Sequence, residues 1–388
     1  MIPKQNLSRA FHKAISQPRY AVRNLNHRLK STASYRLFNG WSYWPETISL
    51  FLTFACNLRC KMCGQWGEDG VFKDYNSDLL RERLSLQEIQ KLIDDVKHFN
   101  PNITLFGGEP LLYPNWTKVV EIVKSAGLRC NIVTNGVLLN RWAEEIVDLE
   151  LDEIIFSLDG PEEIHDDIRG VKGTFRKAID SFININNLKH QKNKKRPLIS
   201  INTVLTEQTY RYLDEIAEIA EQIDTDVLTF HHLLFLDSQN VNNFIDFFNG
   251  EFDQTPSDWL GFVVNKIPDF DIDQLLSNIK SIKSRKSTVD ITFYPNFRDD
   301  EIKEWYSQFP FQSCSYKNRC MSLWMTAYIF PDGSVRPYHT MNFTPGNIKN
   351  SSFKEIWNNQ IYKKYRSYIK KHKKFDICSK GCTEFFRY

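Results

Sequence analysis

The sequence predicts an α/β fold built around a parallel sheet. Between residues 48 and 236, six short apolar runs alternate with longer segments whose apolar residues fall three and four positions apart. Strands that alternate with helices in this way are joined by right-handed crossovers, in a doubly wound sheet or a barrel. In both arrangements ligands bind at the carboxyl ends of the strands. The unusual glycine and polar motifs of this chain stand at those ends.

Each strand is predicted from its own run of residues. In chain order the runs are TISLFLTF (47–54), NITLFGG (102–108), CNIVTNG (130–136), EIIFSLDG (153–160), LISINTVL (198–205) and DVLTFHHLLF (226–235). The segments SLQEIQKLIDDVKHF, NWTKVVEIVKSAG and WAEEIVDL lie between them and have the period of amphipathic helices.

Three further parts flank this core. Residues 1–46 form a basic amino-terminal arm. Before Glu46 the arm contains Lys, Arg and His but no Asp or Glu. Its apolar residues recur at near-helical spacing and are Leu7, Phe11, Ala14, Ile15, Val22, Leu25 and Leu29. We therefore expect the arm to dock on an acidic partner or substrate, on an anionic membrane face or on its own domain. Residues 241–310 are expected to be a mostly helical connection. Residues 311–388 predict a small metal-stapled domain with a hairpin about PDG and one helix over 351–371.

Composition narrows the function classes. The 388 residues are 41% apolar and 14% aromatic, with a net charge of +3, as expected of a globular protein. A secretion signal and an apolar run long enough to cross a bilayer are both missing, so a cytoplasmic protein is predicted. Eight cysteines in that reducing compartment indicate metal ligands or buried thiols more than disulfides. Nucleic acid is not an expected partner.

Three cysteines, Cys56, Cys60 and Cys63, stand in CNLRCKMC directly after the first predicted strand. A structural zinc site requires four ligands, usually in two separated pairs. A 4Fe–4S cluster held by only three thiolates keeps one iron open to another ligand. The loop therefore favours an iron–sulfur cluster that binds something at its fourth iron.

With GGEP, TNG, SLDG and INTVL ending successive strands, the loop resembles the CxxxCxxC loop of the radical S-adenosylmethionine (SAM) superfamily. The resemblance covers about residues 47–236 and implies a partial (β/α)6 parallel barrel, a 4Fe–4S cluster on the three cysteines and SAM on the open iron. It also implies the residues that bind SAM, which are Met62, Gly107, Gly108, Glu109, Thr134, Asn135, Ser157, Asp159, Arg169, Asn202 and Val204.

Two of these implied contacts are charged. The family pattern places Glu109 on the methionyl amino group and Arg169 on the methionyl carboxylate, and a guanidinium suits a planar carboxylate. The glycines are expected to let backbone approach the ligand closely. Met62 is a departure, because the residue before the third cysteine is commonly aromatic; a thioether also covers a ring face.

A second cysteine set lies in the last 80 residues. The pattern around Cys314, Cys320, Cys378 and Cys382 resembles the SPASM and Twitch extensions, which hold auxiliary iron–sulfur clusters. The resemblance implies one auxiliary 4Fe–4S cluster on these four thiolates. Tyr338 stands where the family usually has a cysteine. If one of the four is uncommitted, either His339 is a ligand or an iron stays open for substrate. Cys130 opens a strand at its far end and is predicted to be a core residue.

The superfamily chemistry is reductive cleavage of SAM to a 5'-deoxyadenosyl radical that abstracts a substrate hydrogen. We predict a ribosomally synthesised peptide as substrate; the alternatives are a small molecule such as a sugar or aminoglycoside alcohol, and a non-catalytic iron–sulfur electron carrier. Expected partners are a reductant such as flavodoxin or ferredoxin and a separate leader-peptide-binding protein. His231 and His232, near the end of the sixth strand, are candidate proton acceptors.

Overall fold

The computed structural model describes residues 18–388, so Leu7, Phe11, Ala14 and Ile15 of the arm lie outside the described residues. Within the described chain one sheet has the strand order β10-β9-β8-β1-β2-β3-β4-β5-β6-β7. The strands are β1 Thr47–Phe51, β2 Asn102–Phe106, β3 Arg129–Thr134, β4 Glu153–Ser157, β5 Leu198–Leu205, β6 Val227–His232, β7 Asp290–Tyr294, β8 Thr326–Ile329, β9 Ser334–Arg336 and β10 Gly346–Asn347.

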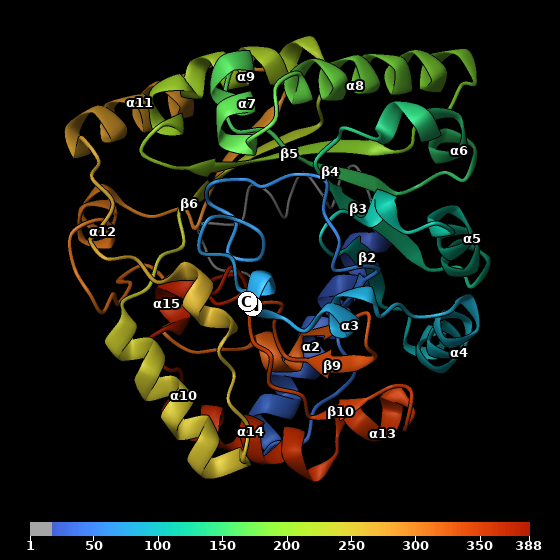
Figure 1. The fold of residues 1–388 in the computed structure, drawn as a ribbon, viewed down its shortest axis with the longest axis vertical. Helices are drawn as coiled ribbons and strands as arrows, with labels where there is room; N and C mark the ends of the chain where they lie inside the picture. The colour runs from blue at the N-terminus through green and yellow to red at the C-terminus, as the bar shows by residue number, and fades with distance from the viewer. Residues whose placement is uncertain (1–17) are drawn as a thin grey trace.

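The α/β prediction is confirmed, and all six predicted strands occur in the predicted order. Neighbouring strands from β1 to β7 pair in parallel. Figure 1 shows these strands curving around a central space, with helices on the outside. Every residue of β1 is buried, as expected of a strand covered on both faces.

The helices cover the outer face and the two ends of the sheet (Figure 1). They are α2 Pro18–Leu37, α3 Ser77–Arg81, α4 Leu86–Val96, α5 Trp116–Ser125, α6 Ala143–Asp148, α7 Glu162–Arg169, α8 Thr174–Gln191, α9 Leu213–Gln222, α10 Ser238–Phe252, α11 Ile272–Ser284, α12 Asp299–Trp305, α13 Phe353–Trp357, α14 Gln360–His372 and α15 Cys378–Gly381. The three predicted helices correspond to α4, α5 and α6. No described helix has both the length and the apolar character needed to cross a membrane.

The sheet extends beyond the six predicted strands on both sides. On one side, β7 pairs with β6, although region 241–310 was expected to be mostly helical connection. On the other, β8 of the carboxyl-terminal hairpin pairs in parallel with β1. In a six-stranded sheet the two edge strands, here β1 and β6, have unpaired backbone N–H and C=O groups. Pairing with β8 and β7 satisfies these groups. The cysteine-rich region therefore shares the sheet of the barrel.

The described part of the basic arm, α2, docks on its own domain. Arg28 forms an ion pair with the buried Glu46 (Nε to Oε2, 2.7 Å), and Arg23 donates to the Asn102 side chain (2.8 Å). Both partners lie at the amino ends of strands. The apolar face predicted from the sequence does not make this contact: Val22, Leu25 and Leu29 are 69%, 50% and 59% exposed.

The single helix predicted over 351–371 is divided in two. The prediction was wrong at Asn358, whose backbone leaves the helical region (φ −123°, ψ 27°). The side chain of Asn359 accepts a hydrogen bond from the Tyr362 N–H and begins α14. Asparagine is a preferred residue at that position, because its side-chain oxygen satisfies a free N–H of the first turn. The predicted hairpin about PDG is confirmed as β8 and β9.

Candidate functional site

The loop that carries Cys56, Cys60 and Cys63, here called the cysteine loop, connects β1 to the short helix η2 (Val71–Asp74) at the carboxyl end of the sheet. Three anchors hold it. The Trp66 indole N–H donates to the Phe54 carbonyl (2.7 Å), the Lys61 N–H donates to the Ile168 carbonyl at the end of α7 (2.9 Å), and the Gly67 N–H donates to the Cys63 carbonyl (2.8 Å). The loop is thus fixed by protein contacts to the chain that follows β1 and to α7.

The donor chemistry of the loop fits an iron–sulfur cluster. Burial is the main cause that raises the pKa of Cys56 to about 12, and the nearby Glu109, Cys60 and Cys63 contribute in the same direction, so the thiols lie near one another. Binding a cluster would release their protons. Within residues 18–388, no three His, Cys, Asp or Glu side chains converge on one point as ligands of a single metal ion do. Thiolates around a cube of irons do not need to converge in that way.

The two glycines of GGEP are required by the protein backbone itself. A Cβ on Gly107 would lie 2.6 Å from the Thr53 carbonyl oxygen, and one on Gly108 would lie 2.2 Å from that of Ala55. Gly107 also has a φ of +141°. The Gly108 and Glu109 N–H groups donate to those two carbonyls, at 2.9 and 2.8 Å. The end of β2 is therefore joined directly to the chain that leads into the cysteine loop.

Glu109 is buried at this junction and keeps acceptor capacity. Its carboxylate accepts from the Leu111 N–H (3.1 Å), the Thr134 hydroxyl (2.8 Å) and the Asn135 N–H (2.9 Å). A carboxylate can accept about four hydrogen bonds, so one position remains for a cationic ligand group. Burial raises the pKa of Glu109 to about 7, in spite of these donors. An ammonium group placed beside it would favour the carboxylate form.

Arg169 and Asp159 form a buried ion pair across the site. The guanidinium also donates to the Ser157 carbonyl (2.9 Å) and to the Cys60 sulfur (3.6 Å). Its Nε is buried and has no hydrogen-bond partner among the described residues. Asp159 accepts a further bond from the Val204 N–H (3.2 Å). Arg169 thus pairs with Asp159, and its unpartnered Nε is suited to the expected ligand carboxylate.

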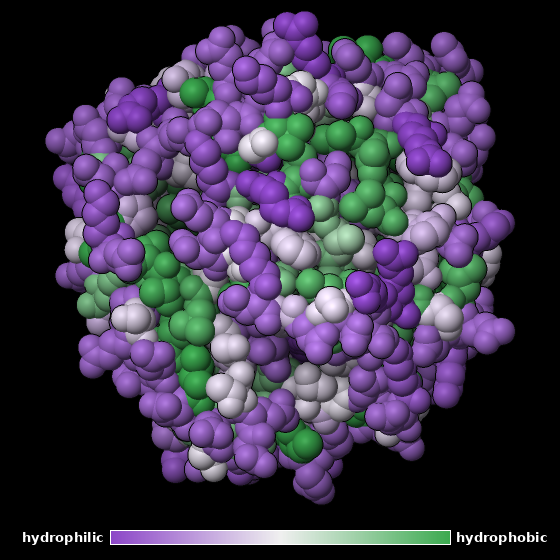
Figure 2. All heavy atoms as spheres, in the orientation of Figure 1, coloured by the Kyte–Doolittle hydropathy of each residue, from purple (hydrophilic) through white to green (hydrophobic). Residues whose placement is uncertain are grey.

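The remaining implied SAM contacts lie on inward-facing positions. Ser157, Asn202 and Val204 are half-buried, whereas the residues that alternate with them are fully buried. The same pattern occurs on β2 and β6, at Phe106 and His231. The interior of the barrel is therefore open near the carboxyl ends of the strands. Figure 2 shows apolar side chains reaching the surface near the centre of this face. Met62, also half-buried, lies on the cysteine loop.

Three of the four late cysteines are close together. They are Cys320, Cys378 and Cys382, here called the auxiliary thiols. Cys320 raises the pKa of both Cys378 and Cys382, and Cys378 raises that of Cys382, although burial is the larger cause. Cys378 reaches a pKa of about 12. The fourth, Cys314, is exposed, and no hydrogen bond among the described residues joins its thiol to the others. The structure therefore brings together three of the four predicted auxiliary ligands.

Four buried phenols surround the auxiliary thiols, and the sequence motifs do not predict them. Tyr365 is within electrostatic reach of all three thiols, while Tyr294, Tyr328 and Tyr338 are within reach of Cys382. The Tyr338 hydroxyl also bonds to the Thr383 hydroxyl (3.0 Å), one residue after Cys382. Tyr338, at the position where the family usually has cysteine, is thus part of the wall of this site.

The candidate histidines separate into two kinds. His232 is buried and bonds to the Tyr306 hydroxyl (Nδ1 to Oη, 3.0 Å), and burial lowers its pKa to about 3, as in a packed core. His231 faces the barrel interior. With His232 it borders a cavity of about 10 Å³, which also touches Cys382 and could hold at most one water. Both histidines therefore lie nearer the auxiliary thiols than the sequence suggests.

The sequence predicts His339 only as a possible iron ligand, whereas the structure shows which side chains surround it. Its ring lies 4.1 Å from that of Tyr338 and 5.8 Å from that of Phe106, the last residue of β2 before GGEP (centroid distances). It is half-buried, although burial lowers its pKa to about 3. The His339 imidazole is surrounded by protein but keeps some accessible surface, so it lines the interior. His339 therefore lies between the two cysteine sites.

A buried ion pair ties region 241–310 to both cysteine-bearing parts. Asp258 accepts from the Tyr75 hydroxyl (2.8 Å) and from Arg336 of β9 (3.1 Å). Tyr75 follows the cysteine loop, and Arg336 belongs to the late hairpin. The sequence could not indicate this connection, because its three members are 78 or more residues apart.

These features define an iron–sulfur protein with one cluster site poised for a ligand and a second, buried site. Two family models match the chain, the radical SAM superfamily over residues 50–220 and the SPASM iron–sulfur cluster-binding domain over residues 320–383. Residues 50–220 are therefore a radical SAM domain and residues 320–383 a SPASM domain. The radical SAM domain implies SAM and a 4Fe–4S cluster as cofactors, and the SPASM domain implies an auxiliary iron–sulfur cluster.

Individual relatives are distant. The Fe-coproporphyrin III synthase of Methanosarcina barkeri is 28% identical over 47% of this chain and 43% of its own length. The sporulation killing factor maturation protein SkfB of Bacillus subtilis is 31% identical over 47% of this chain and 40% of its own. The chain thus spans less than half of each. The tungsten-containing aldehyde ferredoxin oxidoreductase cofactor-modifying protein of Pyrococcus furiosus is 24% identical over 86% of both chains.

The fold is shared with a solved structure. Streptococcus suis SuiB bound to precursor peptide SuiA superposes with a TM-score of 0.62 at 14% identity, covering 96% of this chain and 80% of that one. At this identity the similarity shows the fold alone.

Proposed function

We propose that this enzyme uses SAM to oxidise or crosslink a ribosomally synthesised peptide. When bound, the cluster and SAM supply a 5'-deoxyadenosyl radical that takes a hydrogen atom from the substrate. The proposal rests on the edge of the sheet where the three thiols of the cysteine loop lie near Glu109 and Arg169. Glu109 has one acceptor position left, and the Nε of Arg169 has no hydrogen-bond partner among the described residues. These two groups match the two charged ends of an amino acid.

The chain's own residues orient SAM and keep water away from it. Glu109 and Arg169 would bind the methionyl ammonium and carboxylate. Ser157, Asn202 and Val204 face the interior, where they can contact the nucleoside, and Met62 lies on the loop above. Holding the reacting groups in one orientation accounts for much of the rate enhancement in enzymes.

His339 is suited to accept a proton from the substrate. It lines the interior between the two sites, and its depressed pKa keeps the imidazole neutral, with a free nitrogen lone pair, at neutral pH. Its Nδ1 bonds to the Thr340 hydroxyl (2.8 Å), which orients the ring. His231 is a second candidate on the opposite wall.

A peptide substrate is supported by relatives. SkfB is named for the maturation of a killing factor, and SuiB is described with a precursor peptide. The expected partners are a low-potential reductant such as flavodoxin or ferredoxin, and a separate leader-binding protein. A cytoplasmic location agrees with the need for such a reductant.

A small-molecule substrate is the second candidate. The relative that matches 86% of this chain is named for modifying a metal cofactor, and another is named as a porphyrin synthase. The partly open interior is compatible with a compact substrate as well as a peptide side chain.

Isotope transfer tests the proposal. Anaerobically reconstituted, reduced enzyme is mixed with SAM and a precursor peptide, from a neighbouring gene, that is fully deuterated in its core segment. We expect 5'-deoxyadenosine to be released and to carry deuterium. Cys56→Ala should release none. If 5'-deoxyadenosine forms without deuterium from the peptide, but gains deuterium when a deuterated small molecule replaces the peptide, the peptide proposal is wrong and the second candidate is supported.

A further inference from the structure

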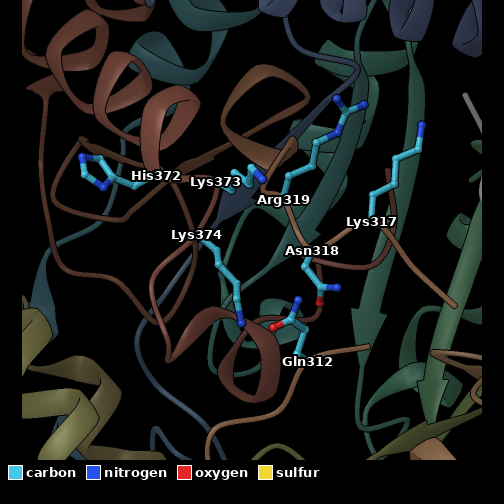
Figure 3. Close-up of a pocket in the computed structure, with 7 residues that line it drawn as sticks. All are labelled: Gln312, Lys317, Asn318, Arg319, His372, Lys373 and Lys374. Atoms are coloured by element: carbon cyan, nitrogen blue, oxygen red, sulfur yellow. The ribbon is translucent and has the colours of Figure 1, made fainter. Parts of the chain in front are cut away.

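A strongly basic hollow of about 400 Å³ opens on the surface outside the auxiliary thiols. Two segments, 312–319 and 372–374, face each other across it (Figure 3). Its lining residues are Gln312, Lys317, Asn318, Arg319, His372, Lys373 and Lys374. None is acidic, and the carboxylate of Asp376 acts on Lys374. Lys317 and Lys373 are exposed, and their side chains make no hydrogen bond or ion pair with another described residue.

The lining of this basic pocket is continuous with the cluster-binding backbone. The Cys320 N–H donates to the Lys373 carbonyl (2.8 Å). The Lys374 ammonium donates to the Ser379 hydroxyl (3.2 Å), one residue after Cys378, and the Phe375 N–H donates to the Cys378 sulfur (3.4 Å). Hydrogen bonds therefore connect Lys373 directly to the backbone of Cys320, and Lys374 to the residue that follows Cys378.

The pocket lies away from the SAM site. The Arg319 guanidinium lies over the Tyr35 ring of α2 (5.1 Å), and α2 packs at the amino ends of the strands. The cysteine loop and the open interior are at the carboxyl ends. A substrate bound in the pocket could not reach the radical, whereas a redox partner needs only to approach the auxiliary cluster.

We propose that the basic pocket is the docking site of an acidic electron-carrier protein of the flavodoxin type, which accepts electrons from the auxiliary cluster. The inference rests on the proposed function, since removing a hydrogen atom and then a proton from the substrate leaves one electron to dispose of. That electron passes through the site of the auxiliary thiols to the carrier, whose oxidised flavin becomes a semiquinone and takes up one proton from solvent.

Charge and interface size favour this occupant. Electron-transfer encounters bury little surface and are steered by complementary charge, which raises association rates by tenfold or more at low salt. A pocket with several cations, placed beside the thiols, meets both requirements.

The test measures electron transfer by stopped flow. Reduced holoenzyme is mixed with oxidised flavodoxin, and semiquinone formation is followed at several salt concentrations. We expect Lys317→Glu/Lys373→Glu to lower the second-order rate at low salt about tenfold and to remove its salt dependence. The control Lys177→Glu/Lys195→Glu changes the net charge equally, on α8 and before β5 at the other side of the molecule (Figure 1), and should keep the rate within about twofold.

Two further measurements distinguish a failure of the docking proposal from a failure of the proposed function. With dithionite as reductant, both variants should form 5'-deoxyadenosine at the wild-type rate, which shows intact clusters. Loss of 5'-deoxyadenosine in the wild type would contradict the function and leave the docking result standing. An equal fall in both variants, or no fall in either, overturns the docking site. Loss of binding to an acidic leader peptide, with the flavodoxin rate unchanged, would assign the pocket to the peptide and also overturn it.

Discussion

The two cysteine sites of this enzyme are built from the same thiol chemistry but have different surroundings. The cysteine loop is half-buried and is bordered by ionisable groups, Glu109, Asp159 and Arg169, which retain unused hydrogen-bonding capacity. Cys320 and Cys382 are buried. Four phenols surround the auxiliary thiols, and the charged groups that act on them include Glu384, which is paired with Arg387.

The difference indicates two roles. Charged groups with spare capacity select a charged ligand, and the open edge of the first site gives that ligand access. Phenols, burial and a carboxylate that is already paired with Arg387 do not favour a further charged ligand, which suits a cluster that only carries electrons.

Replacing Cys56, Cys60 and Cys63 together with Ala should abolish 5'-deoxyadenosine release, because the SAM-binding cluster is lost. About four irons per chain should remain, held by the auxiliary thiols. Iron analysis and chromatography of the reaction measure both. Essentially no remaining iron would mean that the second site holds no cluster.

The opposite variant, Cys378→Ala/Cys382→Ala, should lose about four irons but keep slow 5'-deoxyadenosine release in the absence of substrate. The thermal midpoint should fall by several degrees, because this small region has little core of its own. Calorimetry and iron analysis test this expectation, which an unchanged iron content would contradict.

Glu109→Gln and Arg169→Ala should each weaken SAM binding by about 1.5 to 3 kcal/mol, or tenfold to a hundredfold, because a charge-assisted hydrogen bond is lost. Isothermal titration under anaerobic conditions measures the affinity. Glu162→Gln, which removes an exposed carboxylate of α7, is a matched control and should bind normally. Unchanged affinity in both site variants would exclude these residues as SAM ligands.

SAM affinity should also depend on pH through Glu109. Its pKa of about 7 in the free protein lies above the ordinary value, so the carboxyl is protonated below pH 7 and cannot pair with an ammonium. The dissociation constant should therefore rise as pH falls below 7, by up to about tenfold per pH unit. The Glu109→Gln variant should show a flat profile over the same range.

Cys314→Ala should have the smallest effect. Its thiol is exposed and apart from the auxiliary thiols, so we expect most of the auxiliary iron to remain. A loss of iron equal to that of Cys320→Ala would show that the loop 312–319 moves and that Cys314 is a full ligand.

Several features follow from the sequence alone. Period and composition predict the six parallel strands and several of the helices between them, because burial on both faces requires continuous apolar runs. The spacing of the first three cysteines, with glycine motifs at strand ends, predicts where SAM binds. These signals are local, and a chain records local requirements in neighbouring residues.

Other features required the tertiary structure. The pairing of β8 with β1, the clasp of Tyr75, Asp258 and Arg336, and the position of His339 beside Phe106 join segments far apart in the chain. No short pattern encodes such contacts, since they depend on how distant elements pack. For the same reason the sequence predicts four auxiliary ligands and cannot rank them. Only the folded chain brings three thiols together and leaves Cys314 at the surface.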